Sequence, residues 1–296
     1  EPEVVAQSAR VLDFLLPTTP PEPQALTLAF VGDIMLARAV RSKVEAHGRG
    51  DYRWLFEGVP ELKQADILFG NLEGALSDQG HNVGSIYSFR MEPASLPALV
   101  DAGFDVLSVA NNHAGDWTRA AFEDTLKRLN RAGITSVGGG MNKAEATQVK
   151  ILERGGLKFG FLALTDVGPN WLAATTDQSG ILLANDPEFK VIVAKAADRV
   201  DILVVSFHFG DEYQHEPNAR QRALAQDAIA AGAKIVAGHH PHVSQPVERY
   251  QDGVIAYSLG NFVFDQYVRR DTMRGTVLYV KLLGTEIIDV TTKTAI

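Results

Sequence analysis

KIVAGHHPHV, residues 234–243, joins a short apolar run to three histidines that fall within four positions. The run KIVA has the length and composition of a buried strand, and a glycine ends it before the histidines begin. His239, His240 and His242 therefore stand at the carboxyl end of a predicted strand. A solvated loop that is rich in histidine by chance and a metal site both fit this stretch alone, so the rest of the chain has to distinguish them.

The same pattern, an apolar run that ends in polar residues, recurs along the chain. Further runs of this kind are predicted as strands at 25–31, 65–69, 104–110, 159–165, 201–207 and 253–258. Apolar residues with helical spacing lie between them, at 36–47, 94–102, 118–131, 188–199 and 219–231. Alternating strands and helices predict an α/β fold with a central sheet. In such folds ligands bind beyond the carboxyl ends of the strands, which is where the polar residues fall.

Composition excludes several classes of function. The formal net charge of −8 argues against nucleic-acid binding, which requires a basic surface. The chain has no cysteine, so thiolate metal sites, disulfides and cysteine nucleophiles are excluded. No apolar stretch approaches the roughly 18 residues that a membrane-spanning helix needs.

The N-terminal part differs in composition from the rest. Residues 1–24 are predicted to be a short apolar segment followed by a proline-rich linker, PTTPPEP at 17–23, and residues 25–296 a single domain. The chain begins at Glu1 and not at methionine, which suggests that a preceding segment has been removed, and a signal peptide or membrane anchor is compatible with this start. We expect an extracytoplasmic protein that is anchored to the membrane or secreted.

The polar residues at the strand ends suggest a metal site when they are taken together. Each has a simple structural explanation on its own, as a helix cap, a turn residue or a buried histidine. One sheet edge would nevertheless gather the following set: Asp33, Asn71 or Glu73, Asn112, His113, His208, His240 and His242. Oxygen and imidazole ligands without thiolate suit divalent ions, and the pattern does not distinguish zinc, manganese, iron or magnesium. One or two ions are expected, and a pair would activate a water between them.

Six motifs in order resemble the CapA family, the PgsA-type proteins associated with poly-γ-glutamate capsule synthesis. They are GDIMLAR (32–38), GNLEG (70–74), ANNHAGD (110–116), SFHFGDEY (206–213), GHHPHV (238–243) and YSLGNFVFD (257–265). The resemblance covers residues 26–265 and implies the calcineurin-like metallophosphoesterase fold, a four-layer α/β/β/α sandwich. It also implies an anionic polymer or peptide as substrate and membrane-bound partners in capsule synthesis.

The metallophosphoesterase pattern carries over with two departures. The first motif keeps Asp33 but has Met35 in place of its histidine, and the bridging aspartate of the second motif falls on Asn71. Glu73 is the replacement carboxylate that the resemblance offers. The remaining positions match as follows: Asn112 as a ligand, His113 as general acid with Asp116 as its partner, and His208, His240 and His242 as ligands, with His239 left over. This predicts a strong site of Asn112, His208, His240 and Glu73 and a weak site of Asp33 and His242.

Other residues near the motifs are candidates for substrate contact or support of the ligands. Arg38 and Arg90 would bind a carboxylate or phosphate, although a solvated or salt-bridged arginine is at least as common. Glu212, Tyr213, Asn261 and Asp265 would support the metal ligands or belong to turns. The run Gly138-Gly139-Gly140 lacks the lysine and spacing of a phosphate-binding loop.

Three functions remain open at this point. The first is a metal-dependent enzyme that hydrolyses a γ-glutamyl or peptide bond, or moves a proton next to a carbonyl group. The second is a non-catalytic module that binds the polymer for assembly or export, which the loss of two ligands favours. The third is a general phosphodiesterase, for which a full set of ligand motifs would be expected.

Overall fold

The computed structural model describes residues 24–295, so the predicted N-terminal segment and the proline-rich linker at 17–23 lie outside the described residues. The α-helices are α2 (Arg38–His47), α3 (Leu96–Ala102), α4 (Thr118–Arg131), α5 (Lys143–Ala146), α6 (Phe189–Ala197) and α7 (Ala219–Ala230). Short 3-10 helices are η1 (Tyr52–Phe56), η2 (Pro60–Gln64), η3 (Pro93–Ser95) and η4 (Asn170–Leu172). The five helical stretches predicted from apolar spacing correspond to α2, α3, α4, α6 and α7.

Two main sheets form the centre of the molecule. The first has the order β17 (Glu286–Ala295), β16 (Gly275–Leu283), β1 (Leu26–Ile34), β2 (Ile67–Leu72), β5 (Val106–Ser108) and β6 (Thr135–Val137), and β15 (Asn261–Val263) also pairs with β1. The second has the order β13 (Val247–Tyr250), β14 (Gly253–Ala256), β12 (Ile235–His239), β11 (Ile202–His208), β9 (Leu157–Thr165) and β8 (Lys150–Arg154). Two-stranded ladders join β3 (Ala75–Leu76) to β4 (Arg90–Met91) and β7 (Gly139–Gly140) to β10 (Gly180–Ile181).

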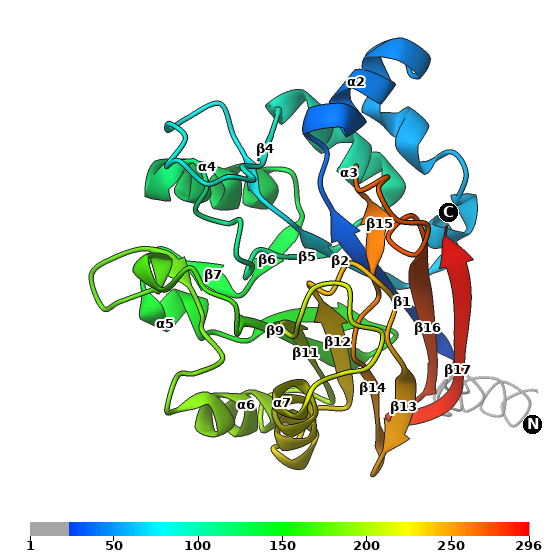
Figure 1. Ribbon diagram of the computed structural model, residues 1–296. Helices are drawn as coiled ribbons and strands as arrows, with labels where there is room; N and C mark the ends of the chain where they lie inside the picture. The colour runs from blue at the N-terminus through cyan, green and yellow to red at the C-terminus, as the bar shows by residue number, and fades with distance from the viewer. Residues whose placement is uncertain (1–23, 296) are drawn as a thin grey trace, which may run out of the picture.

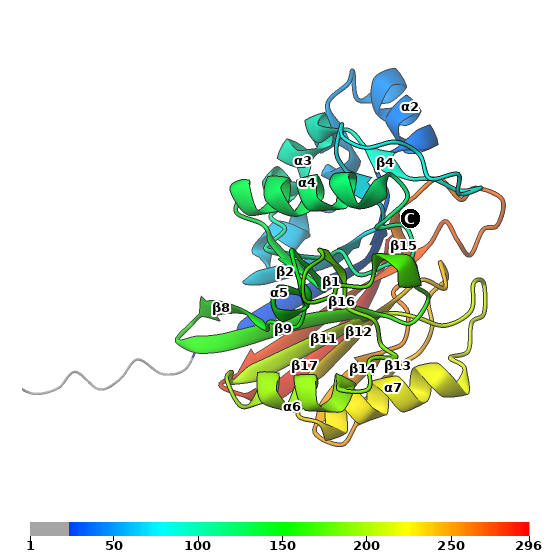
Figure 2. The same cartoon turned by 90° about the vertical axis from the view of Figure 1, so that its left-hand side faces the viewer.

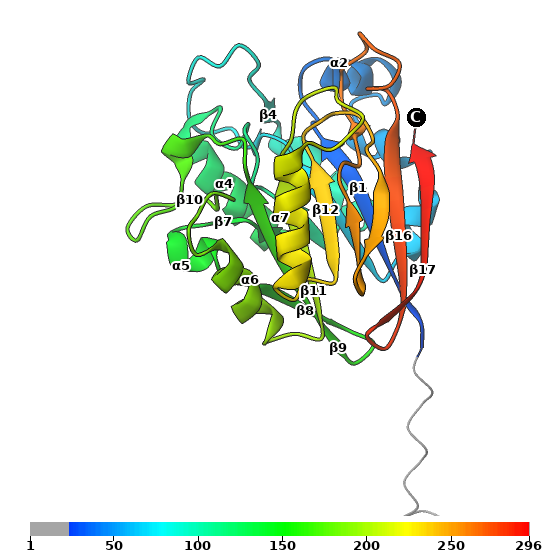
Figure 3. The same ribbon diagram turned by 60° about the horizontal axis from the view of Figure 1, so that its bottom comes forward.

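The layers are helix, sheet, sheet and helix. In Figure 1 and Figure 2, α2, α3 and α4 lie on the outer side of the first sheet, and α6 and α7 lie on the outer side of the second. Figure 3 shows α7 in front of the second sheet, beside β12 and running in much the same direction as the strands. The predicted four-layer α/β/β/α sandwich is confirmed.

Burial explains why the two sheets stack. Both faces of each sheet are covered, so their central strands are nearly continuous apolar runs. Between the sheets, Phe69 of β2 stacks on Phe161 of β9 with ring centroids 6.1 Å apart. Each such fully buried aromatic or aliphatic side chain contributes about 1.5–3 kcal/mol to folding. Separate apolar clusters lie under the helices of the two outer layers.

The parallel strands are aligned so that their carboxyl ends meet at one edge. Asp33 of β1 is opposite Asn71 of β2, and Asn71 is opposite Ser108 of β5. In the second sheet His208 of β11 is opposite His239 of β12. Residues that are distant in sequence therefore lie next to each other at this edge.

The C-terminal hairpin of β16 and β17 is a part of the fold that the search for apolar runs does not find. β16 pairs antiparallel with both β1 and β17, and most residues of β17 are exposed. An edge strand with one face in water carries polar residues along its length, and these interrupt the apolar run. The glycine run has a packing role: a Cβ at Gly138 would lie 2.6 Å from the Cβ of Ala110, and Gly139 and Gly140 pair with β10.

Among residues 24–295, no helix is both long enough and apolar enough to cross a bilayer.

Candidate metal centre

Ligand-type side chains gather where the carboxyl ends of the two sheets meet. Asp33, Glu73 and His208 each offer one ligand atom, and these atoms lie within 4.8 Å of one another. All three side chains are buried. We call them the inner ligand group. Two of them come from the first sheet and one from the second, so the stacking of the sheets assembles the group.

A second group lies beside the first and closer to solvent. Glu212, His240 and His242 also place ligand atoms within 4.8 Å of one another. The two histidines are buried, whereas Glu212 is exposed. We call these the outer ligand group. The rings of His208 and His240, with centroids 4.8 Å apart, connect the two groups.

Glu73 is the residue that most requires a partner. Its side chain is fully buried, and neither carboxylate oxygen has a hydrogen-bond donor within the described part of the chain. The Nε2 atoms of His113 and His242 each lie 3.9 Å from its Oε1, too far for a hydrogen bond. Burial raises the pKa of Glu73, and the nearby carboxylate of Asp33 raises this pKa further. Such a group is costly unless a cation or a donor occupies the space beside it.

Asp33 is held in place from both sheets. Asn71 donates from Nδ2 to its Oδ1 at 2.8 Å, and the backbone N–H of His240 donates to its Oδ2 at 3.3 Å. Burial alone would raise the pKa of Asp33, but the rings of His239 and His242 outweigh burial and hold this pKa well below its usual range. Asp33 is therefore an ionised carboxylate in a fixed position, as a metal ligand must be.

Asn112 and His208 lie side by side, as two ligands of one ion would. The Nε2 of His208 donates to Oδ1 of Asn112 at 2.7 Å. Ligands that bind an ion at about 2.1 Å are separated from their neighbours by roughly 3 Å, so this pair needs little movement to share an ion. Burial lowers the pKa of His208, and the nearby ring of His240 lowers it further, so the imidazole is kept neutral as metal binding requires.

The two histidines of the outer ligand group have opposite pKa shifts. Burial, with the neighbouring ring of His242, lowers the pKa of His240 to about 4. Burial would also lower the pKa of His242, but the carboxylates of Glu73 and Asp33 outweigh it and raise this pKa to about 9. The Nδ1 of His242 lies 2.9 Å from Oδ1 of Asn261, which leaves Nε2 toward Glu73. A metal-binding histidine commonly donates its other ring N–H to such a partner.

The loop after β12, which carries His240 and His242, has a strained backbone. His240 and His242 have φ values of 98° and 59°, in the left-handed region that residues other than glycine rarely adopt. Pro241 lies between them. Conformations of this kind are concentrated at functional sites, where the surrounding structure enforces them.

His113 and Asp116 form a hydrogen-bonded pair at the edge of the inner ligand group. The Nδ1 of His113 lies 2.7 Å from Oδ2 of Asp116, and the backbone N–H of Phe89 donates to the same oxygen at 2.9 Å. The ring of Phe89 packs against His113 with centroids 3.9 Å apart. The imidazole is thus fixed with Nε2 on the side of Glu73. This is the geometry of an acid–base residue with an orienting carboxylate.

The side chains present fit one or two divalent ions. Carboxylate, amide and imidazole donors converge, no thiolate is available, and Glu73 together with Nδ1 of His240 lacks any hydrogen-bond partner in the stretch that the structure describes. The grouping by distance differs from the predicted one. Asp33 lies with Glu73 and His208, and His242 lies with His240.

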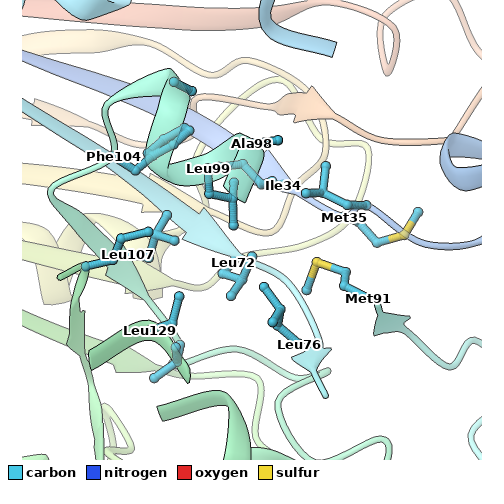
Figure 4. Close-up of a cluster of buried hydrophobic side chains, with 14 of the residues drawn as sticks. Ile34, Met35, Leu72, Leu76, Met91, Ala98, Leu99, Phe104, Leu107 and Leu129 are labelled. Carbon is cyan, nitrogen blue, oxygen red and sulfur yellow. The ribbon is translucent and has the colours of Figure 1, made fainter. Parts of the chain in front are cut away.

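The two departures from the metallophosphoesterase pattern have structural explanations. Met35 is fully buried in the apolar cluster under α2 and α3, where Figure 4 shows it near Met91. Its sulfur lies 3.2 Å from the backbone nitrogen of Ala37. Asn71 is not a free ligand either, because its amide donates to Asp33 and accepts from Asn111 at 3.3 Å. Met35 and Asn71 therefore make structural contacts, and Glu73 is the carboxylate that lies beside Asp33 and His208.

Other candidates from the sequence lie at different distances from the site. His239 is fully buried between the sheets, with Nδ1 3.4 Å from Oδ1 of Asp33 and its ring stacked near Phe69. Arg38 lines a cavity next to the outer ligand group and pairs with Asp265. Arg90 is exposed, lies over the ring of Trp117 at 3.7 Å, and is not among the residues that line this cavity.

Glu212 is the ligand-type residue that the sequence places only in a supporting role. It follows His208 by four residues in FHFGDEY, on the loop that leaves β11. Its place in the outer ligand group depends on how this loop folds back over the strand end, which the spacing from His208 does not indicate. The cavity beside it has a volume of about 180 Å³. A larger hollow of about 870 Å³ lies between α5 and α6, and none of the residues of either ligand group lines it.

The fold of this chain is shared with several solved structures. Solved structures with the same fold include a 5'-nucleotidase precursor from Thermus thermophilus, with a TM-score of 0.54, 15% identity, and coverage of 92% of this chain and 54% of that chain. The calcineurin-like phosphoesterase YfkN from Bacillus subtilis matches with a TM-score of 0.50 and 14% identity over 93% of this chain and 91% of that chain. The architecture is that of the calcineurin-like metallophosphoesterases.

The chain belongs to the bacterial capsule synthesis protein family PGA_cap, whose family model matches residues 27–266. The capsule biosynthesis protein CapA of Bacillus anthracis is 37% identical over 279 residues, which cover 91% of this chain and 67% of that protein. The PGA biosynthesis protein CapA of Bacillus subtilis is 36% identical, with coverage of 90% and 70%. The resemblance to the CapA family that the six motifs predict is thereby confirmed.

Proposed function

We propose that this protein is a divalent-metal-dependent hydrolase that cleaves a γ-glutamyl or related amide bond in an anionic polymer. The observation that carries the proposal is the fully buried carboxylate of Glu73, which has no hydrogen-bond partner among residues 24–295 and lies near the side chains of Asp33, His208 and His242. A cation bound beside this buried carboxylate would offset the cost of its ionised form, which in the absence of an ion is disfavoured against the protonated form. The substrate class rests on the similarity to the two CapA proteins, one of which is described as a PGA biosynthesis protein.

In this proposal the inner ligand group and Asn112 would hold one ion, and the outer ligand group a second. Bound divalent ions would supply Lewis acidity toward the substrate carbonyl and lower the pKa of a water. Asp33 and Glu73 supply the negative charge that balances the ions. Asn71 and Asn261 keep Asp33 and His242 in position through the hydrogen bonds described above.

His113 is proposed to move the proton. Asp116 accepts from Nδ1, which fixes the ring orientation and stabilises the protonated imidazole. The opposite nitrogen, Nε2, is directed toward Glu73 and the cavity, and it would donate a proton to the leaving amine. The ring of Phe89 packs against the imidazole and helps to hold it in this orientation.

One alternative is a module that binds the polymer without cleaving it. The position of Met35 favours this alternative. The metallophosphoesterase pattern has a histidine there, and in this chain the residue packs in the apolar cluster instead. Under either function, the role in capsule synthesis suggests an extracytoplasmic location and membrane-bound synthesis partners. Fractionation of producing cells, followed by cross-linking of the full-length protein, would test both suggestions.

Metal content and turnover on a γ-linked glutamyl polymer test the proposal together. We expect one or two equivalents of metal, and loss of cleavage by about 100-fold or more in His113→Gln with the metal retained. His240→Ala should lose both metal and activity. His47→Gln is the matched control, since His47 is exposed at the end of α2.

The alternatives predict different results in the same assays. A non-catalytic module would bind the polymer with no turnover, and His240→Ala would leave that binding intact. A phosphodiesterase would hydrolyse a bis-aryl phosphodiester faster than the glutamyl polymer. Either result would remove the hydrolase proposal.

A further inference from the structure

The cavity beside the outer ligand group is small and chemically mixed. Its volume of about 180 Å³ is below the roughly 300–1,000 Å³ that drug-sized ligands occupy, so it suits a single residue or head group. Its lining combines residues of the metal centre with a charged pair and an aromatic side chain: His113, Glu212, His242, Arg38, Asp265 and Tyr213.

Arg38 is held so that one side of its guanidinium remains available. Its Nε lies 3.1 Å from Oδ2 of Asp265, and the same oxygen accepts from the backbone N–H of Ala39 at 3.1 Å. The guanidinium carbon lies 5.2 Å from the centre of the Phe89 ring. The side chain of Arg38 is 39% exposed. The terminal nitrogens make no hydrogen bond to any residue that the structure describes, and their fork geometry suits a carboxylate.

Asp265 has an unused acceptor next to this arginine. Its side chain is only 2% exposed, and its Oδ1 is buried with no donor from residues 24–295. A buried carboxylate oxygen without a donor is unfavourable, because it has lost the hydrogen bonds of water. A ligand N–H placed in the cavity would remove this cost. The pair therefore offers two donors from Arg38 and one acceptor from Asp265 to the same small ligand.

The charge of the lining admits a carboxylate. Arg38 contributes a positive charge, Asp265 is paired with it, and Glu212 and His242 belong to the outer ligand group that would hold an ion in the metal-loaded protein. A carboxylate can therefore pair with the free nitrogens of Arg38. The buried oxygen of Asp265 in addition favours a ligand that has an N–H group close to its carboxylate.

We propose that this cavity is a subsite that binds one γ-linked glutamyl residue through its free α-carboxylate. Each residue of such a polymer carries an α-carboxylate and an amide N–H on the same carbon atom, so a single residue offers partners both for the free nitrogens of Arg38 and for Oδ1 of Asp265. Arg38 binds the carboxylate, and Asp265 orients Arg38 and accepts from the amide. This inference takes the γ-glutamyl polymer from the proposed function. It adds that Arg38 and Asp265 are the residues that recognise the α-carboxylate and amide of that polymer.

Binding to two synthetic oligomers tests the subsite separately from cleavage. One probe is a γ-linked glutamyl pentamer, and the other is a pentamer of γ-aminobutyrate, which has the same backbone without α-carboxylates. The metal-loaded protein should prefer the first. Arg38→Gln should weaken binding of the glutamyl pentamer by about 10- to 100-fold. The affinity for the γ-aminobutyrate pentamer should change by no more than about twofold. Arg38→Lys should fall between, because it keeps the charge but not the fork.

Two further variants complete the test. Asp265→Asn should weaken glutamyl binding by about tenfold or less, since a neutral oxygen is a weaker acceptor. Arg41→Gln is the matched control, because Arg41 lies on the same helix and pairs with Glu45 and Glu92 instead. Equal binding of both pentamers by the unaltered protein, or equal weakening of both by Arg38→Gln, would overturn the subsite even if the polymer is cleaved. Selective binding without cleavage would support the subsite and remove the hydrolase proposal.

Discussion

The inner and outer ligand groups differ in burial more than in chemistry. Each contains carboxylate and imidazole, but the inner group is entirely buried, whereas the outer group includes the exposed Glu212. Charge interactions are stronger in a buried setting and are screened at the surface. The comparison suggests a tightly held ion inside and an exchangeable ion outside, next to the cavity that would receive the substrate.

Removing the buried carboxylate should have the largest effect. Glu73→Gln keeps the size of the side chain but removes its charge, so the inner ion loses one of its two anionic ligands. We expect its affinity to fall by roughly 100- to 1,000-fold, the share of one ligand in a typical site. Titration of the metal-stripped protein with manganese or zinc measures this. Glu57→Gln, at an exposed position, serves as the control. An unchanged inner affinity would exclude Glu73 as a ligand.

The second largest effect should be the dependence of metal affinity at the outer ligand group on pH. The pKa of His242 is raised to about 9, so this ring is protonated at neutral pH in the metal-free protein and must lose the proton to bind an ion. Outer-site affinity should therefore rise about tenfold per pH unit from pH 7 up to about 9, or about 100-fold in total. Calorimetry in buffers of different ionisation enthalpy would count the released proton, and His242→Asn should release none.

The same proton affects the stability of the metal-stripped protein. The folded-state pKa of His242 lies above the unfolded value of 6.5, so its contribution is complete below pH 6.5. That contribution is lost as the pH rises through about 9. The raised pKa of Glu73 acts in the same direction, because the folded state again binds the extra proton. Thermal unfolding between pH 6.5 and 9 should show this decline, and a stability that rises over this interval would contradict the shifts.

Removing the exposed ligand should have a smaller effect. Glu212→Gln should weaken binding of the second metal ion, at the outer ligand group, by about tenfold, because an exposed charge contributes less than a buried one. The affinity for the first ion, at the inner ligand group, should not change. Asp211→Asn is the control one residue away, since Asp211 accepts from Asn218 and belongs to neither ligand group. If Glu212→Gln weakens the first equivalent instead, the assignment of the two groups is wrong.

Much of the fold and of the candidate site could be predicted from sequence, for a physical reason. Buried parallel strands are continuous apolar runs, and their ends coincide with the polar residues, so Asp33, His208 and His240 could be placed at one edge. The mostly exposed strand β17 lacks such a run, and β16, with the short run VLYV at 277–280, also lies outside the predicted strands. The position of Glu212 depends on how the loop after β11 folds back, and the burial of His239 depends on the distance between the sheets. Neither is encoded in local spacing.

The smallest effect is expected at Met35, which stands where the metallophosphoesterase pattern described above has a histidine. Its side chain packs in the cluster with Met91 in Figure 4, so it belongs to the core and to neither ligand group. Met35→Leu conserves volume and should change the free energy of unfolding by less than about 1.5 kcal/mol, with the affinities for both ions unchanged. Denaturant unfolding and metal titration measure the two quantities. Met35→His is a further test, because it places the histidine of the metallophosphoesterase pattern in this apolar environment. It should destabilise the protein without adding metal, since a buried imidazole there would lack polar partners. A gain of metal affinity in Met35→His would instead show that this position still faces the centre, and the inner group would then need a further member.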